Sequence, residues 1–173
     1  EFSEVIASGD VLYDLAFLLM DLVERGLGPA ANIVFNRYLA DSQRDKNLDA
    51  LAALPFFLAT RAAIRAMVTA ARLERAAADE RPEIVRSARG YFDWALRFIA
   101  PSPPIILAVG GLSGTGKSVL ARALAPTLAP PPGAVVLRSD VTRKTLLGVD
   151  EFEQLPPEAY TPEVTARVYA TII

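Results

Sequence analysis

Apolar residues recur at helical spacing along the first hundred residues. Over residues 11–24 they form one main stripe, made by Leu12, Leu15, Leu19, Leu22 and Val23. Asp10 is a suitable N-cap for this helix, and several residues off the stripe are also apolar, as in a buried helix. The same spacing predicts helices from Pro29 to residue 39, from Pro55 to about residue 77 and from Pro82 to residue 99. No strand pattern competes, so we expect a helical bundle or the helical part of a larger domain.

The pattern changes in the second part of the chain. Residues 105–109 and 134–137 are short apolar runs rich in isoleucine and valine, typical of buried parallel strands. Between them, residues 118–125 have helical spacing, and Pro126 ends or kinks that helix. Strand, loop, helix and strand in this order form a βαβ unit. We therefore expect an α/β fold class, in which a helical region is followed by the start of a parallel α/β domain.

Three prolines mark the boundary between these parts. Pro101, Pro103 and Pro104 cannot continue a helix and favour extended backbone. We therefore divide the chain into a helical domain at residues 1–100, a proline-rich hinge at 101–104 and a second domain at 105–173.

A glycine-rich turn follows the first apolar run. Gly111, Gly116, Lys117 and Ser118 match the phosphate-binding P-loop pattern G-x-x-x-x-G-K-[ST]. Glycines allow a tight turn whose backbone N–H groups face a polyphosphate, and the helix dipole adds to the attraction. The expected nucleotide-binding residues are Gly111, Leu112, Ser113, Gly114, Thr115, Gly116, Lys117 and Ser118. The predicted cofactors are ATP and Mg²⁺, with Lys117 at the β- and γ-phosphates and the Ser118 hydroxyl on the metal ion.

Asp140 follows the second apolar run. In open α/β sheets ligands lie beyond the carboxyl ends of the strands, which predicts that Asp140 shares an edge with the P-loop. Its carboxylate can accept the proton of a substrate hydroxyl that attacks the γ-phosphate, and Arg143 can hold the substrate or neutralise charge. Lys117, Asp140 and Arg143 are therefore the candidate catalytic residues. The sequence leaves open that Asp140 only caps the next helix, with Arg143 on its surface.

The composition excludes several kinds of binding and catalytic site. The 173 residues are 52% hydrophobic and contain no cysteine or histidine, which excludes disulfides, zinc sites and Ser-His or Cys-His nucleophiles within this chain. The net charge is −2 and no basic arm is present, so nothing favours a nucleic-acid partner. No signal peptide and no uninterrupted apolar run of about 18–20 residues is visible, which predicts a cytoplasmic protein without a membrane partner. The sequence does not determine the oligomeric state.

Two clusters in the first hundred residues have both a functional and a structural interpretation. Arg61, Arg65, Arg72 and Arg75 fall near one helix face. They could hold an anionic substrate, but a solvated face balanced by Glu74, Asp79 and Glu80 is the preferred interpretation. Asp10 and Asp14 are one turn apart without the spacing of a metal-binding pair, so we expect a helix cap and a structural hydrogen bond.

The end of the chain combines a loop and a helix. Residues 151–158 are acidic and contain prolines, which predicts a mobile loop. Thr161, Pro162 and Glu163 form a helix start, and that helix continues to the last residue. Because the chain begins without methionine and ends within a helical pattern, we expect it to be an excerpt of a longer protein.

Three stretches resemble a known family: Gly-Leu-Ser-Gly-Thr-Gly-Lys-Ser (111–118), Leu-Arg-Ser-Asp-Val-Thr-Arg-Lys (137–144) and Ala-Tyr-Thr-Pro-Glu-Val-Thr-Ala-Arg-Val-Tyr (159–169). The second half resembles the P-loop kinase domain of bacterial two-domain proteins, in which an aminoglycoside-phosphotransferase-like domain is fused to an AAA-like ATP-binding domain. The first half is similar to the end of the phosphotransferase-like domain, with Glu1, Phe2 and residues 9–18 resembling the stretch after its metal-binding aspartate.

The resemblance also implies what this chain lacks. The phosphotransferase catalytic loop and metal aspartate are expected before Glu1. A second acidic metal site, the lid arginines and a strand between the two predicted here are expected after Ile173. The P-loop domain is therefore expected to be truncated, and activity of the excerpt alone is not assured.

The expected function is an ATP-dependent kinase that transfers the γ-phosphate of Mg-ATP to a hydroxyl of a small-molecule acceptor. One alternative is a polynucleotide 5′-hydroxyl kinase, because Asp140 and Arg143 in the pattern Asp-x-x-Arg also resemble that family. The near-neutral charge balance counts against it, since a nucleic-acid groove is basic. A second alternative is a nucleotide-regulated binding module without phosphoryl transfer. The acceptor itself cannot be read from the sequence.

Overall fold

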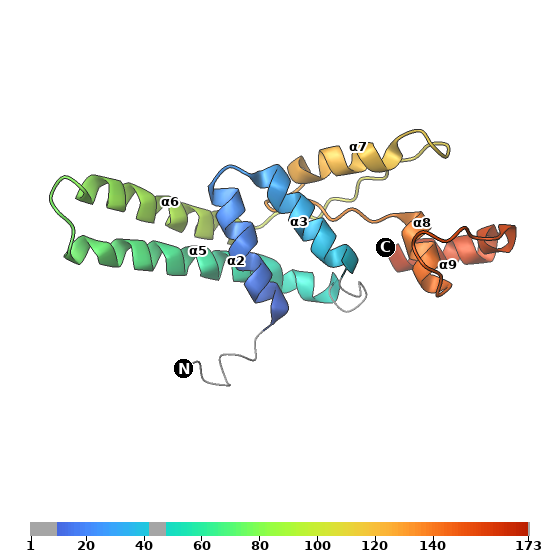
Figure 1. Ribbon diagram of the computed structural model, residues 1–173, viewed down its shortest axis with the longest axis horizontal. Helices are drawn as coiled ribbons and strands as arrows, with labels where there is room; N and C mark the ends of the chain where they lie inside the picture. The colour runs from blue at the N-terminus through green and yellow to red at the C-terminus, as the bar shows by residue number, and fades with distance from the viewer. Residues whose placement is uncertain (1–9, 42–47, 173) are drawn as a thin grey trace.

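The chain folds into helices joined by loops. The structure, a computed structural model, describes residues 10–41 and 48–172. The longer helices are α2 (Val11–Glu24), α3 (Gly28–Asp41), α5 (Leu54–Ala71), α6 (Arg81–Ile99), α7 (Lys117–Leu124), α8 (Ser139–Leu146) and α9 (Pro162–Ile172). Short 3₁₀ turns are η1 (Leu51–Ala53), η2 (Arg72–Glu74), η3 (Ala125–Thr127) and η4 (Pro157–Tyr160). In Figure 1, α5 and α6 form a long hairpin, α2 and α3 lie across one end of it, and α8 and α9 form a pair at the opposite side.

The helices predicted for the first hundred residues are confirmed, except that the one predicted to reach about residue 77 ends earlier, with α5 at Ala71 and η2 at Glu74. The Asp10 carboxylate caps α2 by accepting a hydrogen bond of 2.9 Å from the Leu12 N–H, as its position before the apolar stripe predicts. Pro55 and Pro82 lie in the first turns of α5 and α6, where a missing N–H costs no helical hydrogen bond. Some expectations fall outside the described residues: the resemblance at residues 1–9, most of the polar link at 41–47, and Ile173.

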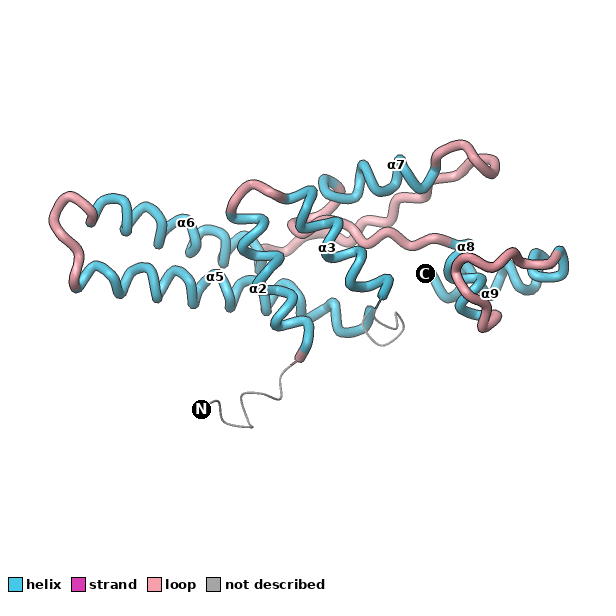
Figure 2. The backbone as a smooth tube through the Cα atoms, in the orientation of Figure 1, coloured by secondary structure: helices cyan, strands magenta, loops and turns pink. Residues whose placement is uncertain are grey.

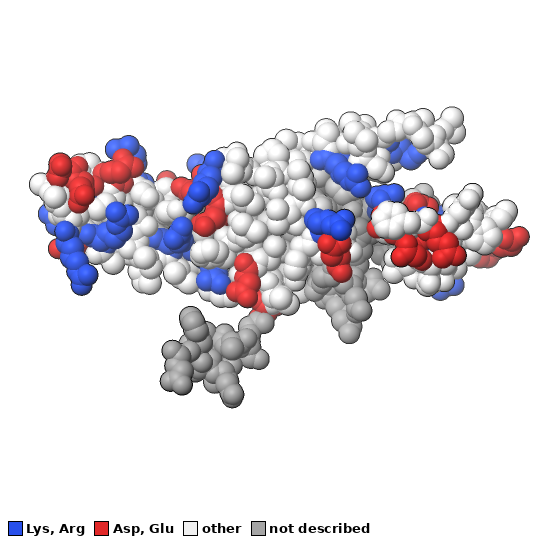
Figure 3. Space-filling model, viewed as in Figure 1, with Lys and Arg blue, Asp and Glu red and all other residues white. Residues whose placement is uncertain are grey.

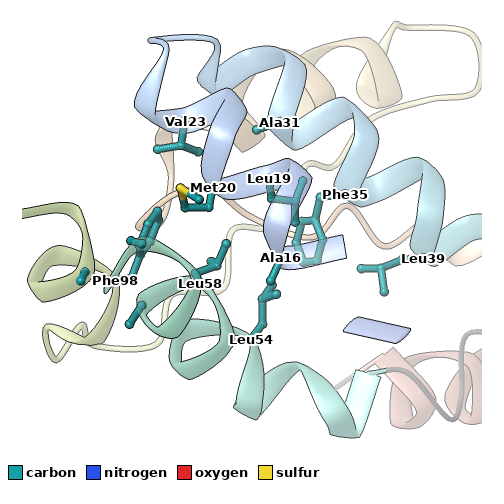
Figure 4. Close-up of a cluster of buried hydrophobic side chains, with 13 residues drawn as sticks. Ala16, Leu19, Met20, Val23, Ala31, Phe35, Leu39, Leu54, Leu58 and Phe98 are labelled. Atoms are coloured by element: carbon teal, nitrogen blue, oxygen red, sulfur yellow. The ribbon is translucent and has the colours of Figure 1, made fainter. Parts of the chain in front are cut away.

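The core lies between α2, α3, α5 and α6. Figure 4 shows its side chains converging from these four helices. The buried members are Ala16, Leu19, Met20, Val23, Ala31, Phe35, Leu39, Leu54, Leu58, Ala59, Ala62, Ala95 and Phe98. Full burial of each large side chain stabilises the fold by roughly 1.5–3 kcal/mol. Val135 also packs against this cluster, so the second half of the chain is docked on the helical part.

The predicted parallel α/β fold is wrong for this structure. Residues 105–109 and 134–137 are extended loops, and none of the described residues forms a β-strand (Figure 2). A parallel strand needs a neighbour for its backbone hydrogen bonds and a cover on both faces. The first segment has neither within the described ranges, and Ile106 is 82% exposed. The second segment bonds to side chains of α3 instead of to a strand.

One described helical segment, Leu48–Glu74, is long and apolar enough to cross a membrane by length and composition alone. The sequence analysis did not identify this segment as a membrane span, because Arg61 and Arg65 interrupt its apolar residues. Core helices of water-soluble proteins pass the same test. Here α5 buries Leu58 and Ala62 in the four-helix core, which accounts for part of its apolar composition.

Candidate nucleotide-binding site

The glycine-rich turn runs directly into the N-terminus of α7. Gly114 and Gly116 have φ angles of 77° and 84°, a backbone region that favours glycine because it has no Cβ. Thr115 closes the turn, since its Oγ1 donates a hydrogen bond of 2.8 Å to the Leu112 carbonyl oxygen. The first backbone N–H groups of a helix have no acceptor inside it, so the start of α7 attracts anions. The turn can therefore present these groups to a phosphate.

Lys117 and Ser118 occupy the first turn of α7. The Lys117 ammonium folds back over the turn and donates to the Leu112 carbonyl oxygen. Among the described residues, the Ser118 hydroxyl has no hydrogen-bond partner, so it is available to a metal ion. Both side chains fit Mg-ATP, because the ammonium can exchange a carbonyl oxygen for phosphate oxygens at little cost. Within the described residues, no group of three or more acidic side chains forms a metal site by itself.

Asp140 lies in the first turn of α8 but does not cap it. The N-cap residue is Arg138, and no side chain caps this helix end. The Asp140 carboxylate is 49% exposed, and its Oδ2 lies 3.9 Å from the Lys144 ammonium. The capping alternative is therefore not observed, and the carboxylate is accessible to a substrate. Lys144 was not among the predicted site residues, although Asp and Lys four residues apart is a readable signal on a helix.

The acidic segment after α8 folds back on the helix. Glu151 forms an ion pair of 2.9 Å with Arg138, and its carbonyl oxygen accepts a hydrogen bond of 2.6 Å from Lys144. Arg138 and Lys144 are thus both bonded to Glu151, in the loop that the sequence predicts to be mobile. No motif identifies Glu151 as their partner.

Arg143 is buried, with 7% of its surface exposed. Its Nη1 donates to the Ala159 carbonyl oxygen at 2.7 Å and its Nη2 to Thr165 Oγ1 at 3.3 Å. The guanidinium carbon also lies 4.9 Å from the centre of the Tyr160 ring. Arg143 therefore links α8, η4 and α9, and is not on the helix surface. Its contact with a substrate remains a prediction.

The P-loop precedes α7, and Asp140 lies in the first turn of α8. In Figure 1 the start of α7 and the start of α8 are both on the side away from the tip of the α5–α6 hairpin. No hydrogen bond or ion pair between described residues joins residues 111–118 to α8. The position of the P-loop relative to the start of α8 therefore depends on the parts of the fold to which both are attached.

The first two arginines of the predicted stripe face α2. Arg61 lies 3.4 Å from Asp14 and stacks 3.9 Å over the Tyr13 ring, and Arg65 lies 3.6 Å from Asp21. Asp14 therefore serves as an ion-pair partner, in line with the structural interpretation of the Asp10–Asp14 pair. These contacts fasten α5 to α2.

The other two arginines lie at the tip of the hairpin. Arg72 and Arg75 line an open groove of about 490 Å³ together with Glu74, Glu80 and Ile84. Because each cation has an acidic neighbour in the lining, the groove carries no excess positive charge. The four arginines do not form one anion-binding surface.

Two asparagines of α3, Asn32 and Asn36, were not predicted as site residues. Both hydrogen-bond the backbone that precedes Asp140. Their spacing of four residues, which places them on one face of the helix, is the only signal that the sequence carries.

Comparisons with known proteins support a nucleotide-binding role for the second half. Residues 106–173 match a family described as AAA domain, which supports a P-loop, nucleotide-binding, kinase-like domain. The described residues show the loop and the helix of such a domain, but not its sheet. The aminoglycoside-phosphotransferase-like part of the resemblance and the order of the domains remain predictions.

The chain is also similar to mycobacterial proteins of unknown activity. It is 30% identical over 146 residues to uncharacterized protein Rv2004c of Mycobacterium tuberculosis and to uncharacterized protein Mb2027c of Mycobacterium bovis. The match covers 84% of this chain and 27% of each relative, so the chain spans about a quarter of their length. No solved structure matches the chain significantly.

Proposed function

We propose that this chain belongs to an ATP-dependent phosphotransferase that moves the γ-phosphate of Mg-ATP to a hydroxyl group of a small-molecule acceptor. One observation carries the proposal. A P-loop sequence, within the residues that match the AAA domain family, turns into the N-terminus of α7 with the Lys117 ammonium folded over it. A cation, unpaired helix N–H groups and a hydroxyl thus meet at one short turn, and together they suit a polyphosphate with a metal ion.

The position of each residue in the site suggests its role in the proposed reaction. The backbone of residues 112–116 and Lys117 bind the β- and γ-phosphates, and Ser118 holds Mg²⁺. When bound, the metal ion neutralises charge on the phosphate oxygens. Asp140 accepts the proton of the acceptor hydroxyl, and Lys144, at 3.9 Å, keeps that carboxylate oriented. Arg143 holds α9 against α8 beneath this site.

The surface favours a small acceptor over a polynucleotide. Figure 3 shows basic and acidic side chains interspersed on the visible face, with a broad uncharged area in the middle. The cations beside Asp140 have acidic partners, because Arg138 pairs with the Glu151 carboxylate and Lys144 lies 3.9 Å from the Asp140 carboxylate. A nucleic-acid groove would need unmatched cations along the strand path.

The rest of the proposal rests on the resemblance. We assign residues 1–100 to the end of an aminoglycoside-phosphotransferase-like domain, and the reaction to the cytoplasm, without a membrane or nucleic-acid partner.

Calorimetric titration with Mg-ATP tests nucleotide binding. We expect micromolar affinity for the wild-type chain and a loss of about tenfold or more in Lys117→Ala, because the mutant lacks the cation that pairs with phosphate oxygens. Arg122→Ala is the matched control, since Arg122 is an exposed cation of the same helix. Absence of binding by the wild-type chain, or equal binding by Lys117→Ala, would contradict the proposal.

An acceptor screen separates the alternative functions. A panel of hydroxylated small molecules is offered beside an oligonucleotide with a free 5′-hydroxyl, and radioactive γ-phosphate is followed into products. Labelling of the oligonucleotide alone would identify a polynucleotide kinase. Tight Mg-ATP binding without transfer to any acceptor, water included, would identify a nucleotide-regulated binding module.

A further inference from the structure

Asn32 of α3 is among the few buried polar side chains of the described chain, with 3% of its surface exposed. Its Nδ2 donates one hydrogen bond of 2.9 Å to the Pro132 carbonyl oxygen and another of 3.0 Å to the Ala134 carbonyl oxygen. Both acceptors are about one hundred residues away in sequence. A buried amide is tolerated when its hydrogen bonds are made, so the contact is specific to this backbone path.

Asn36, one turn further along α3, completes the attachment. Its Nδ2 donates to the Ala134 carbonyl oxygen at 3.1 Å, and its Oδ1 accepts from the Val136 N–H at 2.7 Å. The same Nδ2 lies 3.1 Å from Asn32 Oδ1, which fixes the orientation of both amides. The two side chains therefore do for residues 132–136 what a neighbouring strand does in a sheet. We call this pair, Asn32 and Asn36, the asparagine clamp.

The segment held by the asparagine clamp is also attached to the end of α7, the helix that follows the P-loop. The clamped segment itself bonds to η3, which continues α7, because the Ala134 N–H donates to the Ala125 carbonyl oxygen at 2.8 Å. Ala125 is 1% exposed, and η3 packs against α3. The helix that begins at Lys117 and the strand-like segment that leads to Asp140 are thus fastened to α3 at adjoining points.

Asp140 lies four positions after Val136, whose amide is the last one held by the clamp. Between them α8 begins at Ser139, with the Thr142 N–H and hydroxyl both bonded to the Arg138 carbonyl oxygen. Movement of Val136 along α3 therefore shifts the start of α8 and the carboxylate with it. Because no hydrogen bond or ion pair joins the P-loop to α8 among the described residues, we expect their relative position to depend on this attachment.

We propose that Asn32 and Asn36 are positioning residues for phosphoryl transfer. They are supplied by the helical first half and hold Asp140 in register with the P-loop. The proposal rests on the proposed function, in which Asp140 takes the proton from the acceptor hydroxyl. Nucleotide binding needs only the turn and α7, whereas transfer needs Asp140 correctly placed as well, and misplacement by about 1 Å can cost 10²-fold in rate.

The kinetic test uses Asn36→Leu in the 173-residue chain, with Arg37→Leu as the matched control. Arg37 is exposed on the same helix and pairs only with Asp41 among described residues. We expect kcat for Mg-ATP turnover to fall by about 10- to 100-fold in Asn36→Leu, while KM for ATP stays within about twofold. Asn36→Asp keeps the acceptor for the Val136 N–H but replaces the donor with a carboxylate oxygen beside three acceptor oxygens, so it should lower kcat as well. Arg37→Leu should leave both constants unchanged.

A distance measurement tests the clamp without relying on activity. The chain contains no cysteine, so Arg122→Cys on α7 and Thr145→Cys on α8 allow two spin labels to be attached at exposed sites. We expect a narrow distribution of label distances with the clamp intact and a broad or shifted one in Asn36→Leu. If circular dichroism shows that Asn36→Leu does not fold, Asn36→Asp takes its place in both measurements.

The outcomes separate the two proposals. An unchanged distance distribution in a folded clamp variant would overturn the positioning role, as would an altered distribution with unchanged kcat. A parallel rise of KM and loss of affinity for ATP would place the clamp in nucleotide binding instead and would also overturn it. If Lys117→Ala and Asp140→Asn do not affect turnover, the proposed function fails, while the distance result still decides whether the clamp fixes α8.

Discussion

Replacing Asp140 with asparagine is expected to lower phosphoryl transfer from Mg-ATP by about 10²- to 10⁴-fold, the usual contribution of a positioned general base. Asparagine keeps the size of the side chain but cannot take the proton of the attacking hydroxyl. The carboxylate is half exposed at the start of α8 and its neighbour Lys144 is on the same helix, so the fold should tolerate the change. Initial rates of ADP release at saturating Mg-ATP, with water or an acceptor from the screen, measure the effect.

Two controls make this result interpretable. Glu153→Gln removes one negative charge from an exposed residue of the loop after α8, and it should leave the rate unchanged. Calorimetry should show that Asp140→Asn binds Mg-ATP within about threefold of wild type, because the P-loop is untouched. An unaltered rate in Asp140→Asn would remove Asp140 from the mechanism. A rate loss accompanied by lost ATP binding would instead indicate a role in the nucleotide site.

Replacing Gly133 with alanine is expected to destabilise the fold by roughly 2–5 kcal/mol, the sum of left-handed backbone strain and overpacking. Gly133 has a φ of 93°, and it lies where the proline-rich turn meets η3 and α3. An added Cβ would lie 2.6 Å from the Ala125 carbonyl oxygen, 2.8 Å from Asn32 Nδ2 and 2.9 Å from the Pro126 Cα. Two of these atoms belong to backbone that cannot move aside cheaply. Urea unfolding followed by circular dichroism measures the change in the free energy of unfolding.

Gly148→Ala is the matched control. Gly148 also has a positive φ, of 68°, but nothing lies within 4 Å of the position of its Cβ. This variant should lose only the strain of the left-handed conformation, about 1–2 kcal/mol. Equal losses in the two variants would show that the close approach at Gly133 does not matter, and that the segment before Asp140 is loosely held.

Much of what the sequence predicts depends on interactions between residues that are close together along the chain. The apolar stripe of α2, its Asp10 cap and the prolines in the first turns of α5 and α6 act over a few residues, so the pattern reveals them. The P-loop turn is similarly local, because glycine, lysine and serine within eight residues define it. Residues 105–109 and 134–137, in contrast, were predicted to be strands and are loops.

Sheet formation was predicted wrongly because it is not a local property. An apolar run shows that a segment prefers extended backbone, but its hydrogen-bonding partner is determined elsewhere in the chain. For residues 134–136 that partner is a pair of asparagine side chains about one hundred residues earlier. For residues 105–109 the described part of the chain supplies none, and the isoleucines remain exposed.

The sequence by itself therefore determined the helices, the phosphate-binding turn and the presence of a carboxylate after the second apolar run. Tertiary structure alone decided that Arg61 and Arg65 fasten α5 to α2, that Arg143 is buried between α8 and α9, and that α3 holds the path to Asp140. The physical reason is the same in each case. Arginine and asparagine have several hydrogen-bond donors and can be satisfied by water or by distant backbone, and only the packed fold determines which.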